Sequence, residues 1–427
     1  MENLKNKAPR LSRLLERFFK LDVDYLAQSS LWTTLSFIVG FLSSIITMVA
    51  FGNLLPRETF GIYNYLLSLG ASLSFLTLTG AGTGVLRAVA RGYENVVRLA
   101  LRLQLKYNSL AIITVLVAAI YYGVRGNMLF AGSLLMLAVA YPVAEAFHIY
   151  VQVLTGRKRF DLMAKITSAI TLTGALATVV ALLITDNILI LVAVYASTSL
   201  FPKIIAYKVA TKNIDKSAPN PEQVAEMRRT SFHMTGAGII GVIASYIDKI
   251  ILFQVAGPAT LAVYSFAIAG PERLKSLIKN WMSIALPRLA QSSLLQIRQV
   301  LYQRIGFSLF IGLVLALLYF FLAPLLFKLF LPRYLDAIIY SQVQALSLII
   351  APAAIYIGSV FSTQNMLKAN YALSIGNHIA RIILFVTFGW LWQIWGLVAA
   401  SIASHIINAV IGLIIWEIEF RRLTKTS

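Results

Sequence analysis

The feature that most constrains this chain is a succession of apolar segments of about 20 residues, almost free of charge, along its whole length. Each segment is long enough to cross the roughly 30 Å hydrocarbon core of a bilayer as a helix. Only 13% of the residues are charged, whereas a soluble domain carries about a quarter. The mean hydropathy of +0.77 agrees with this. We therefore predict an all-α polytopic membrane protein.

About twelve transmembrane helices are expected, in two sets of six. Their predicted ranges are 30–53, 60–84, 107–123, 128–153, 163–184, 188–207, 231–256, 260–284, 304–330, 338–362, 371–392 and 395–416. A long polar connection around Pro219 and Pro221 separates the two sets and is typical of a linker. The predicted domains are a basic tail (1–29), an N-lobe (30–207), a cytoplasmic linker (208–230), a C-lobe (231–416) and a second tail (417–427).

The basic residues lie mainly on one side of the predicted membrane. The tails and alternate connections hold 26 lysines and arginines, whereas the other connections hold only Arg57, Arg125 and Arg333. The positive-inside rule then places both termini in the cytoplasm, in an inner (plasma) membrane. The net charge of +20 is thus explained by orientation in a lipid membrane, and no nucleic-acid partner is expected. No cleavable signal peptide is expected, and Trp390, Trp392 and Trp395 fall where an outer aromatic belt is expected.

The two predicted lobes show signs of an internal repeat. Residues 59–63 (TFGIY) and 260–264 (TLAVY) match at an offset of 201, and an arginine follows each tyrosine by 24 residues, Arg87 and Arg288. Upstream, Phe51 matches Phe253 after a one-residue gap. Because each half has an even number of spans, the repeat is parallel, about an axis along the membrane normal.

These residues resemble a known family. The stretch from Gly52 to Tyr63, the glycine-rich end of the second span up to Arg87, and the matching second-half motifs around Asp248 and Tyr264 are similar to polysaccharide biosynthesis proteins. The resemblance is to the Wzx-type O-antigen and capsule flippases of the MOP (multidrug/oligosaccharidyl-lipid/polysaccharide) exporter superfamily. It implies a MATE-like fold of two six-helix bundles around a central cavity lined by spans one, two, seven and eight.

Span eight carries an unusual cluster of charge at Glu272, Arg273, Lys275 and Lys279. A charged side chain near the bilayer centre costs about 2.5–3.5 kcal/mol on an insertion scale, so such residues usually face a watery cavity or a partner. Arginine and lysine both suit phosphate oxygens. We expect Arg273, Lys275 and Lys279 to bind a pyrophosphate in the cavity, although pairing of Glu272 with Lys275 and snorkelling of the others remain alternatives.

Other deep charges leave several interpretations open. Asp248 either pairs with Arg273 or Lys275, holds a coupling proton or sodium ion, or pairs with its neighbour Lys249. Glu145 lies three residues before His148 on one helix face, and we expect it either to form a buried pair with His148 in the N-lobe or to take part in ion coupling. Arg381, which has the same spacing from His378, has no nearby acid. It either faces the cavity as a fourth pyrophosphate ligand or pairs with a distant carboxylate.

The repeat predicts that the N-lobe wall of the cavity is uncharged. The offset places Ala71, Ser72 and Ser74 opposite Glu272, Arg273 and Lys275, and spans one and two are rich in serine and threonine. One wall would then hold phosphate while the other offers hydroxyl groups to sugar or simply packs closely.

The leading functional hypothesis is a flippase rather than an enzyme. Its substrate would be a polyprenyl-pyrophosphate-linked oligosaccharide, namely an O-antigen, capsule or exopolysaccharide unit, moved by alternating access. No ATP-binding or hydrolase motif is present, so transport would be passive or ion-coupled. No cofactor or metal is expected apart from a coupling H⁺ or Na⁺. The absence of cysteine excludes disulfides and thiolate metal sites. Partners would be lipid, the lipid-linked glycan, and a neighbouring glycan polymerase and glycosyltransferases. A MATE-type drug/cation antiporter and a membrane enzyme of glycan assembly are the alternatives.

Overall fold

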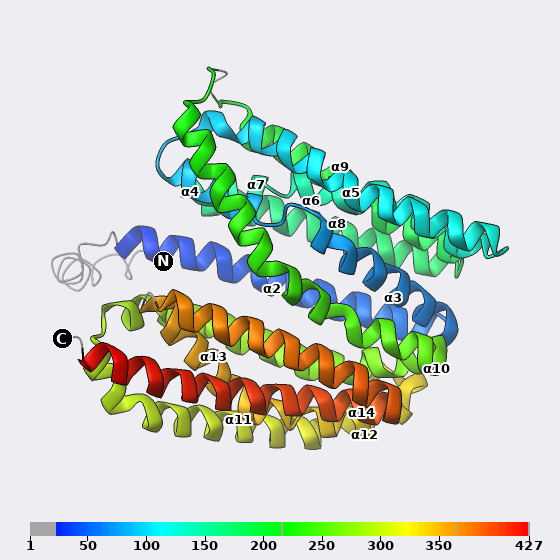
Figure 1. The fold of residues 1–427 in the computed structure, drawn as a ribbon. Helices are drawn as coiled ribbons and strands as arrows, with labels where there is room; N and C mark the ends of the chain where they lie inside the picture. The colour runs from blue at the N-terminus through cyan, green and yellow to red at the C-terminus, as the bar shows by residue number, and fades with distance from the viewer. Residues whose placement is uncertain (1–22, 215–216, 365, 426–427) are drawn as a thin grey trace, which may run out of the picture.

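The computed structural model describes residues 23–214, 217–364 and 366–425, and every regular element in these ranges is a helix (Figure 1). Residues 1–22 of the first predicted tail, 215–216 of the linker and 426–427 of the second tail lie outside the described residues. Eight of the described helices are long and apolar enough to cross a membrane, and the number rises to ten if each of two bent pairs is one span. The predicted polytopic all-α architecture is confirmed.

Two of these helices each consist of two arms that fold back on each other at a break. Helix α10 (Pro221–Gln291) has 71 residues and leaves helical geometry at Gly257, where φ is 81°. Asp248 Oδ2 accepts a 2.8 Å hydrogen bond from the hydroxyl of Tyr264, 16 residues away. On a straight helix these residues would be about 24 Å apart, so the two arms of α10 run side by side. Helix α14 (Leu367–Lys425) breaks at Gln393 in the same way. With the arms counted separately, ten spans become the twelve apolar segments predicted.

The first half of the chain supplies one group of helices. Its long members are α2 (Val23–Leu54), α5 (Val97–Val124), α8 (Phe160–Ile184) and α9 (Ile188–Thr211). One bent pair is α3 (Arg57–Ser72) and η2 (Leu73–Leu76) with α4 (Ala81–Ala90). Helices α6 (Met128–Phe147) and α7 (Tyr150–Gly156) together make one further span. A short turn, η3 (Glu94–Val96), precedes α5.

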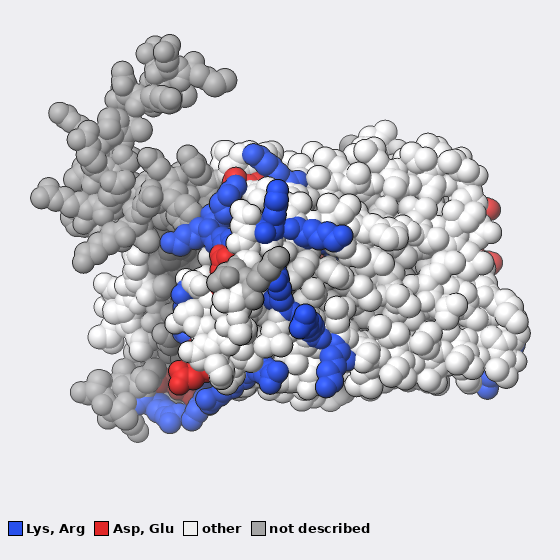
Figure 2. Space-filling model, turned by 90° about the horizontal axis from the view of Figure 1, so that it is seen from above, with Lys and Arg blue, Asp and Glu red and all other residues white. Residues whose placement is uncertain are grey.

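The second half supplies α10, α11 (Leu294–Phe330), η4 (Pro332–Ala337), α12 (Ile338–Gln344), α13 (Ser347–Thr363) and α14. Figure 1 shows the two groups diverging toward the end where the described chain begins and ends. Lysines and arginines gather near that same end on the face drawn in Figure 2. We call it the basic end, and the opposite end, with the α2–α3, α11–η4 and α14 turns, the far end.

The first arm of α10 passes from one group of helices to the other. Near the basic end Met227 and Ser231 are buried, and a Cβ on Gly84 of α4 would meet the Ser231 hydroxyl at 2.5 Å. The backbone N–H of Gly80 donates to Thr235 Oγ1 at 2.9 Å. Further along the same arm, Gly241 packs against His378 of α14. The start of the predicted C-lobe therefore packs on the N-lobe helix α4.

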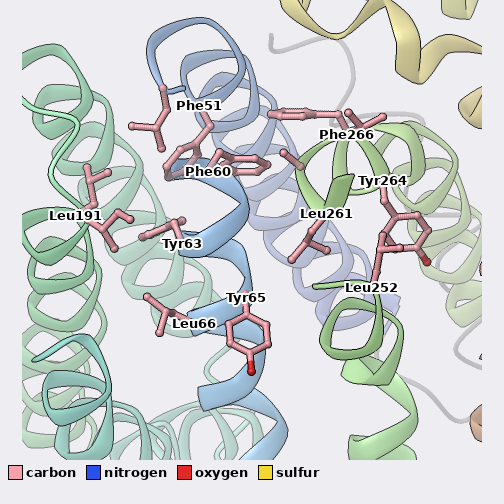
Figure 3. Packing of buried hydrophobic residues seen from close by; sticks show 14 of the residues in the cluster. Phe51, Phe60, Tyr63, Tyr65, Leu66, Leu191, Leu252, Leu261, Tyr264 and Phe266 are labelled. Atoms are coloured by element: carbon pink, nitrogen blue, oxygen red, sulfur yellow. The ribbon is translucent and has the colours of Figure 1, made fainter. Parts of the chain in front are cut away.

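The main apolar core joins the two halves of the chain. The rings of Phe60 and Phe266 lie 4.7 Å apart (Figure 3), and those of Tyr65 and Phe253 lie 3.8 Å apart. At the offset of 201, Tyr65 corresponds to Phe266, so these two equivalent residues each contribute one ring to a contact between the halves.

A close backbone contact holds α3 against the turn of α10. A Cβ added to Gly61 would lie only 1.9 Å from the carbonyl oxygen of Pro258, so only glycine allows this approach. The preceding Gly257 has a positive φ, which suits glycine for the same reason. Nearby at the far end, Arg57 forms a bidentate ion pair with Asp336, with N–O distances of 2.8 and 3.0 Å. The two halves are thus joined at the far end.

Candidate substrate cavity

A cavity of about 500 Å³ lies between the two halves of the molecule. It is lined by α2, α3 and both arms of α10, the four segments that correspond to predicted spans one, two, seven and eight. Its lining residues are Ser44, Thr47, Met48, Phe51, Phe60, Asn64, Lys249, Ser265, Phe266, Ile268, Ala269, Glu272, Arg273 and Ser276. We call it the central cavity.

All the ionisable residues of the central cavity come from α10. They are Lys249 on the first arm and Glu272 and Arg273 on the second. Glu272 also forms an ion pair with Lys275, so its negative charge is shared. The two remaining cations leave the cavity with a positive balance, which favours an anionic group over a cationic one.

The opposite wall of the central cavity is polar without charge, as the repeat predicts. Ser44 and Thr47 of α2 donate their hydroxyl hydrogens to the carbonyls of Phe41 and Ser43, each at 2.7 Å. Their oxygens can still accept hydrogen bonds. Asn64 of α3 accepts a weak contact from Lys249 Nζ at 3.4 Å.

An apolar groove, also of about 500 Å³, adjoins the central cavity between α2, the second arm of α10 and α11. Its walls are mainly leucine and phenylalanine, and Arg273 is its charged member. Leu318 and Leu322 of α11 line the groove and are 61% and 45% exposed, so it reaches the outer surface that would face lipid. Arg273 lines both spaces and therefore lies where they meet.

A third space, of about 270 Å³, lies within the second group of helices, between α10, α13 and α14. We call it the C-lobe pocket. Its lining includes Lys275, Lys279 and Arg381, and it shares Glu272 and Ser276 with the central cavity. Lys275 is buried, pairs with Glu272, and its Nζ lies 3.1 Å from His405 Nε2.

The charged cluster on span eight thus divides between two spaces. Arg273 faces the central cavity and the groove. Lys275, Lys279 and Arg381 line the C-lobe pocket. Glu272 lines the central cavity and the C-lobe pocket. Helical geometry explains this division, because successive residues point about 100° apart. The four predicted pyrophosphate ligands are therefore not gathered around one cavity.

Asp248 is buried and bonded to Tyr264. Among the described residues its other carboxylate oxygen, Oδ1, is buried without a hydrogen-bond partner, and none of the ion pairs formed there includes it. Its neighbour Lys249 turns into the central cavity instead. The residue therefore adopts neither of the cationic pairings considered from the sequence.

Glu145 lies in the last turn of α6, close to Tyr141, Tyr195 and Tyr246. Among the described residues, Glu145 forms no ion pair with His148. His148 instead follows the end of α6, where its ring meets the edge of Tyr150. Glu145 and His148 are near enough to interact electrostatically, but they form no direct ion pair.

Sequence reasoning missed three members of the site. His405 had no motif around it, and only the packing of α14 on α10 brings it to Lys275. Asn64 and Ser265 were also missed, although the repeat offset contained a signal. The amide of Asn64 donates to Ser265 Oγ at 2.8 Å, and these residues are 201 apart, the offset of the repeat.

A profile described as "Polysaccharide biosynthesis protein" matches residues 26–293. No curated protein sequence matches the chain. Among solved structures, it is similar to an inward-facing multidrug resistance MATE family transporter of the MOP superfamily, with 16% identity, a TM-score of 0.66, and coverage of 91% of this chain and 96% of that one.

The lipid II flippase MurJ, in an inward closed conformation, is similar at 12% identity and a TM-score of 0.64, covering 91% of this chain and 87% of that one. A MOP superfamily transporter from Pyrococcus furiosus, described as having a binding pocket of reverse polarity, is 14% identical over 92% of this chain and 95% of that one, with a TM-score of 0.57. At these identities the likeness establishes the fold, which is the predicted MATE-like one.

Proposed function

We propose, from the premise that this chain belongs to the polysaccharide biosynthesis protein family, that it flips a polyprenyl-pyrophosphate-linked oligosaccharide across the cytoplasmic membrane. The observation that carries the proposal is the position of Arg273, where the positively charged central cavity meets the apolar groove. A lipid-linked glycan has three parts in the matching order: a polar head for the cavity, an anionic diphosphate for Arg273 and an apolar tail for the groove.

Each part of such a substrate has a matching surface. Arg273 offers a fork of donors to phosphate oxygens, with Lys249 as a second cation in the same cavity. Sugar hydroxyls would meet Ser44, Thr47 and Asn64 on the opposite wall. The groove would hold the first isoprene units, with the rest of the tail in lipid, because it reaches the lipid-facing surface of α11.

Movement would follow from opening one end of the molecule at a time. The far end is closed here by the Arg57–Asp336 ion pair and by a 2.7 Å hydrogen bond from the Asn53 amide to the Phe330 carbonyl. The positive-inside rule assigns the basic end to the cytoplasm. Loading from the cytoplasmic leaflet and release at the far end then give the direction of export.

Coupling to H⁺ or Na⁺ is part of the proposal, with Asp248 and Glu145 as carboxylates held within the helices. Glycosyltransferases that make the substrate and a polymerase that consumes it would be its functional neighbours.

A drug/cation antiporter is disfavoured by the charges of the central cavity. A cationic drug would meet the two cations Lys249 and Arg273 there. The one acid of the cavity, Glu272, is already paired with Lys275. An enzyme of glycan assembly remains the third alternative.

The proposal is tested by reconstituting the full chain in liposomes with a fluorescent polyprenyl-diphosphate-linked sugar and measuring its transfer between leaflets. Arg273→Ala is expected to abolish transfer, and Lys249→Ala to slow it. Lys328→Ala is the matched control, since Lys328 is an exposed cation on α11 outside the described cavities. Transfer by Arg273→Ala at the wild-type rate would reject the proposal.

A further inference from the structure

A fourth space, of about 440 Å³, opens at the far end of the molecule. It lies apart from the central cavity and shares no lining residue with it. Its walls combine the aromatic rings of Tyr340, Trp392 and Trp395 with the polar side chains of Arg57, Asp336 and Gln393. Its volume falls within the range of about 300–1,000 Å³ found for small-molecule sites. We call it the far-end pocket.

The aromatic side of the pocket is arranged by packing between two helices. The rings of Tyr340 and Trp395 lie 4.8 Å apart at an angle of 57°, and Trp395 keeps 46% of its surface exposed. An indole held on one side and open on the other offers an aromatic face to a ligand. The C–H face of a pyranose ring is a suitable partner, because it carries a slight positive charge and stacks on the electron-rich ring.

The polar side of the pocket is built from planar groups. The Arg57 guanidinium is held in plane by its bidentate pair with Asp336, and both side chains remain about half exposed, at 41% and 48%. Each carboxylate oxygen can accept a further hydrogen bond. Neighbouring hydroxyls of a sugar present donors and acceptors at the spacing that such carboxylate, guanidinium and amide groups require.

Gln393 joins this polar side at the break of α14, with φ of 50° and ψ of −124°. Residues other than glycine rarely adopt such a backbone conformation, and where they do the site is often functional. A glycine would satisfy the turn without strain. A glutamine here instead places an exposed amide beside the pocket. The turn alone does not require that amide.

We propose that the far-end pocket binds a sugar unit, through stacking on Trp395 and hydrogen bonds to Arg57, Asp336 and Gln393. The inference of sugar chemistry comes from the pocket itself, while its link to an exported glycan rests on the proposed function. Membrane-interface anchoring is the competing explanation for tryptophans at this level. Trp390, which is 71% exposed and outside the pocket, fits anchoring and therefore provides the contrast.

The pocket also depends on which end of the molecule is open. Arg57 belongs to the first half of the chain, whereas the other polar and aromatic residues named above belong to the second. A sugar bound there would bridge the halves while the far end is closed and would lose Arg57 when it opens. The glycan would therefore be held most tightly in the conformation described here.

The test uses the full chain in lipid nanodiscs with maltotriose and N,N′-diacetylchitobiose as probes, and saturation-transfer NMR titration as the readout. We expect millimolar or tighter binding of at least one probe. Trp395→Ala should weaken it about tenfold or more, because a stacking contact of about 1.4 kcal/mol is a factor of ten. Trp395→Phe, which keeps a ring, should retain part of the affinity, and Trp390→Ala should bind as the wild type does.

Arg273→Ala separates this proposal from the flippase proposal, because Arg273 is not in the far-end pocket. Loss of leaflet transfer with unchanged sugar binding supports two distinct sites. Absence of binding by both probes to the wild type, or an equal loss in Trp390→Ala and Trp395→Ala, would overturn the sugar site. If the wild type does not transfer the lipid but Trp395→Ala still weakens sugar binding, the sugar site is supported and the flippase proposal is rejected.

Discussion

Asn64 on α3 donates from its side-chain amide to the hydroxyl of Ser265 on the second arm of α10 at 2.8 Å, and the two residues are equivalent positions of the internal repeat. Equivalent residues can touch only where the axis that relates the two halves passes between them. The axis therefore runs between α3 and the second arm of α10. This pair also lines the central cavity, so relative movement of the halves should change its separation.

The first prediction is that a covalent link at this pair stops transport. The chain has no cysteine, so Asn64→Cys with Ser265→Cys introduces the sole thiols. A two-carbon bifunctional methanethiosulfonate reagent should link them, because their hydrogen bond already brings the side chains together. With a protease site inserted in the linker, the linked halves should stay together on a denaturing gel after cleavage.

Leaflet transfer should stop in the linked protein and return after reduction. Each single-cysteine variant treated with the same reagent is the control and should keep its halves separable. Full transfer by a protein that is shown to be linked would mean that this axis is not where the halves move.

The second prediction concerns the far-end ion pair. Arg57→Ala should favour opening of the far end by about 1 kcal/mol, the upper value for an exposed pair, or about fivefold in the ratio of the two states. The readout is labelling of Ser265→Cys by a membrane-impermeant maleimide added on the side of the far end. Labelling should rise about fivefold.

Exchange of the two charges, in Arg57→Asp with Asp336→Arg, should return labelling toward the starting level. Unchanged labelling in Arg57→Ala would show that the ion pair does not hold the far end closed. Because the pair is exposed, high salt should also reduce its effect.

The third prediction concerns the bend between α3 and α4. Asn108 of α5 is fully buried, accepts from the backbone N–H of Leu78 at 3.2 Å and donates to the carbonyl of Pro142 at 2.7 Å. Asn108→Leu would leave the buried N–H of Leu78 without its acceptor, and it would remove the side-chain donor to the Pro142 carbonyl inside α6. We expect the free energy of unfolding in mixed micelles to fall by about 3 kcal/mol.

Ser133→Ala is the buried control, since Ser133 is fully buried and its hydroxyl oxygen has no hydrogen-bond partner among the described residues. Equal losses in Asn108→Leu and Ser133→Ala would indicate that burial alone, and not the two hydrogen bonds, sets the stability of this region.

The fourth prediction compares two glycines. Gly61→Ala should destabilise the fold by about 1–3 kcal/mol, because its Cβ would meet the Pro258 carbonyl oxygen at 1.9 Å and force α3 away from α10. Gly40→Ala on α2 has nothing within 4 Å of the added Cβ and should stabilise its helix by about 0.5–1 kcal/mol. Unfolding in mixed micelles measures both, and the same sign for both variants would contradict the close approach.

The sequence alone determined the fold class, the twelve apolar segments, the repeat and the uncharged N-lobe wall of the cavity. Hydropathy and charge are enough for the fold class and the segments, because lipid and water impose opposite requirements on every segment. Matching residues at a constant offset are enough for the repeat and the uncharged wall. Asn64 and Ser265, which are in contact, are also separated by the offset of 201. The sequence does not show which of the equivalent residues lie on the axis.

Only the tertiary structure decided which space each charge faces. Arg273 and Lys275 are two positions apart on one helix, yet one lies between the central cavity and the groove and the other lies against His405 in the C-lobe pocket. The direction of a side chain from a helix is fixed locally, but what it meets depends on other helices that pack against that helix from distant parts of the chain. For the same reason Trp395 and Trp390 look alike in the sequence, and only the packing of α12 on α14 separates a pocket wall from an exposed ring.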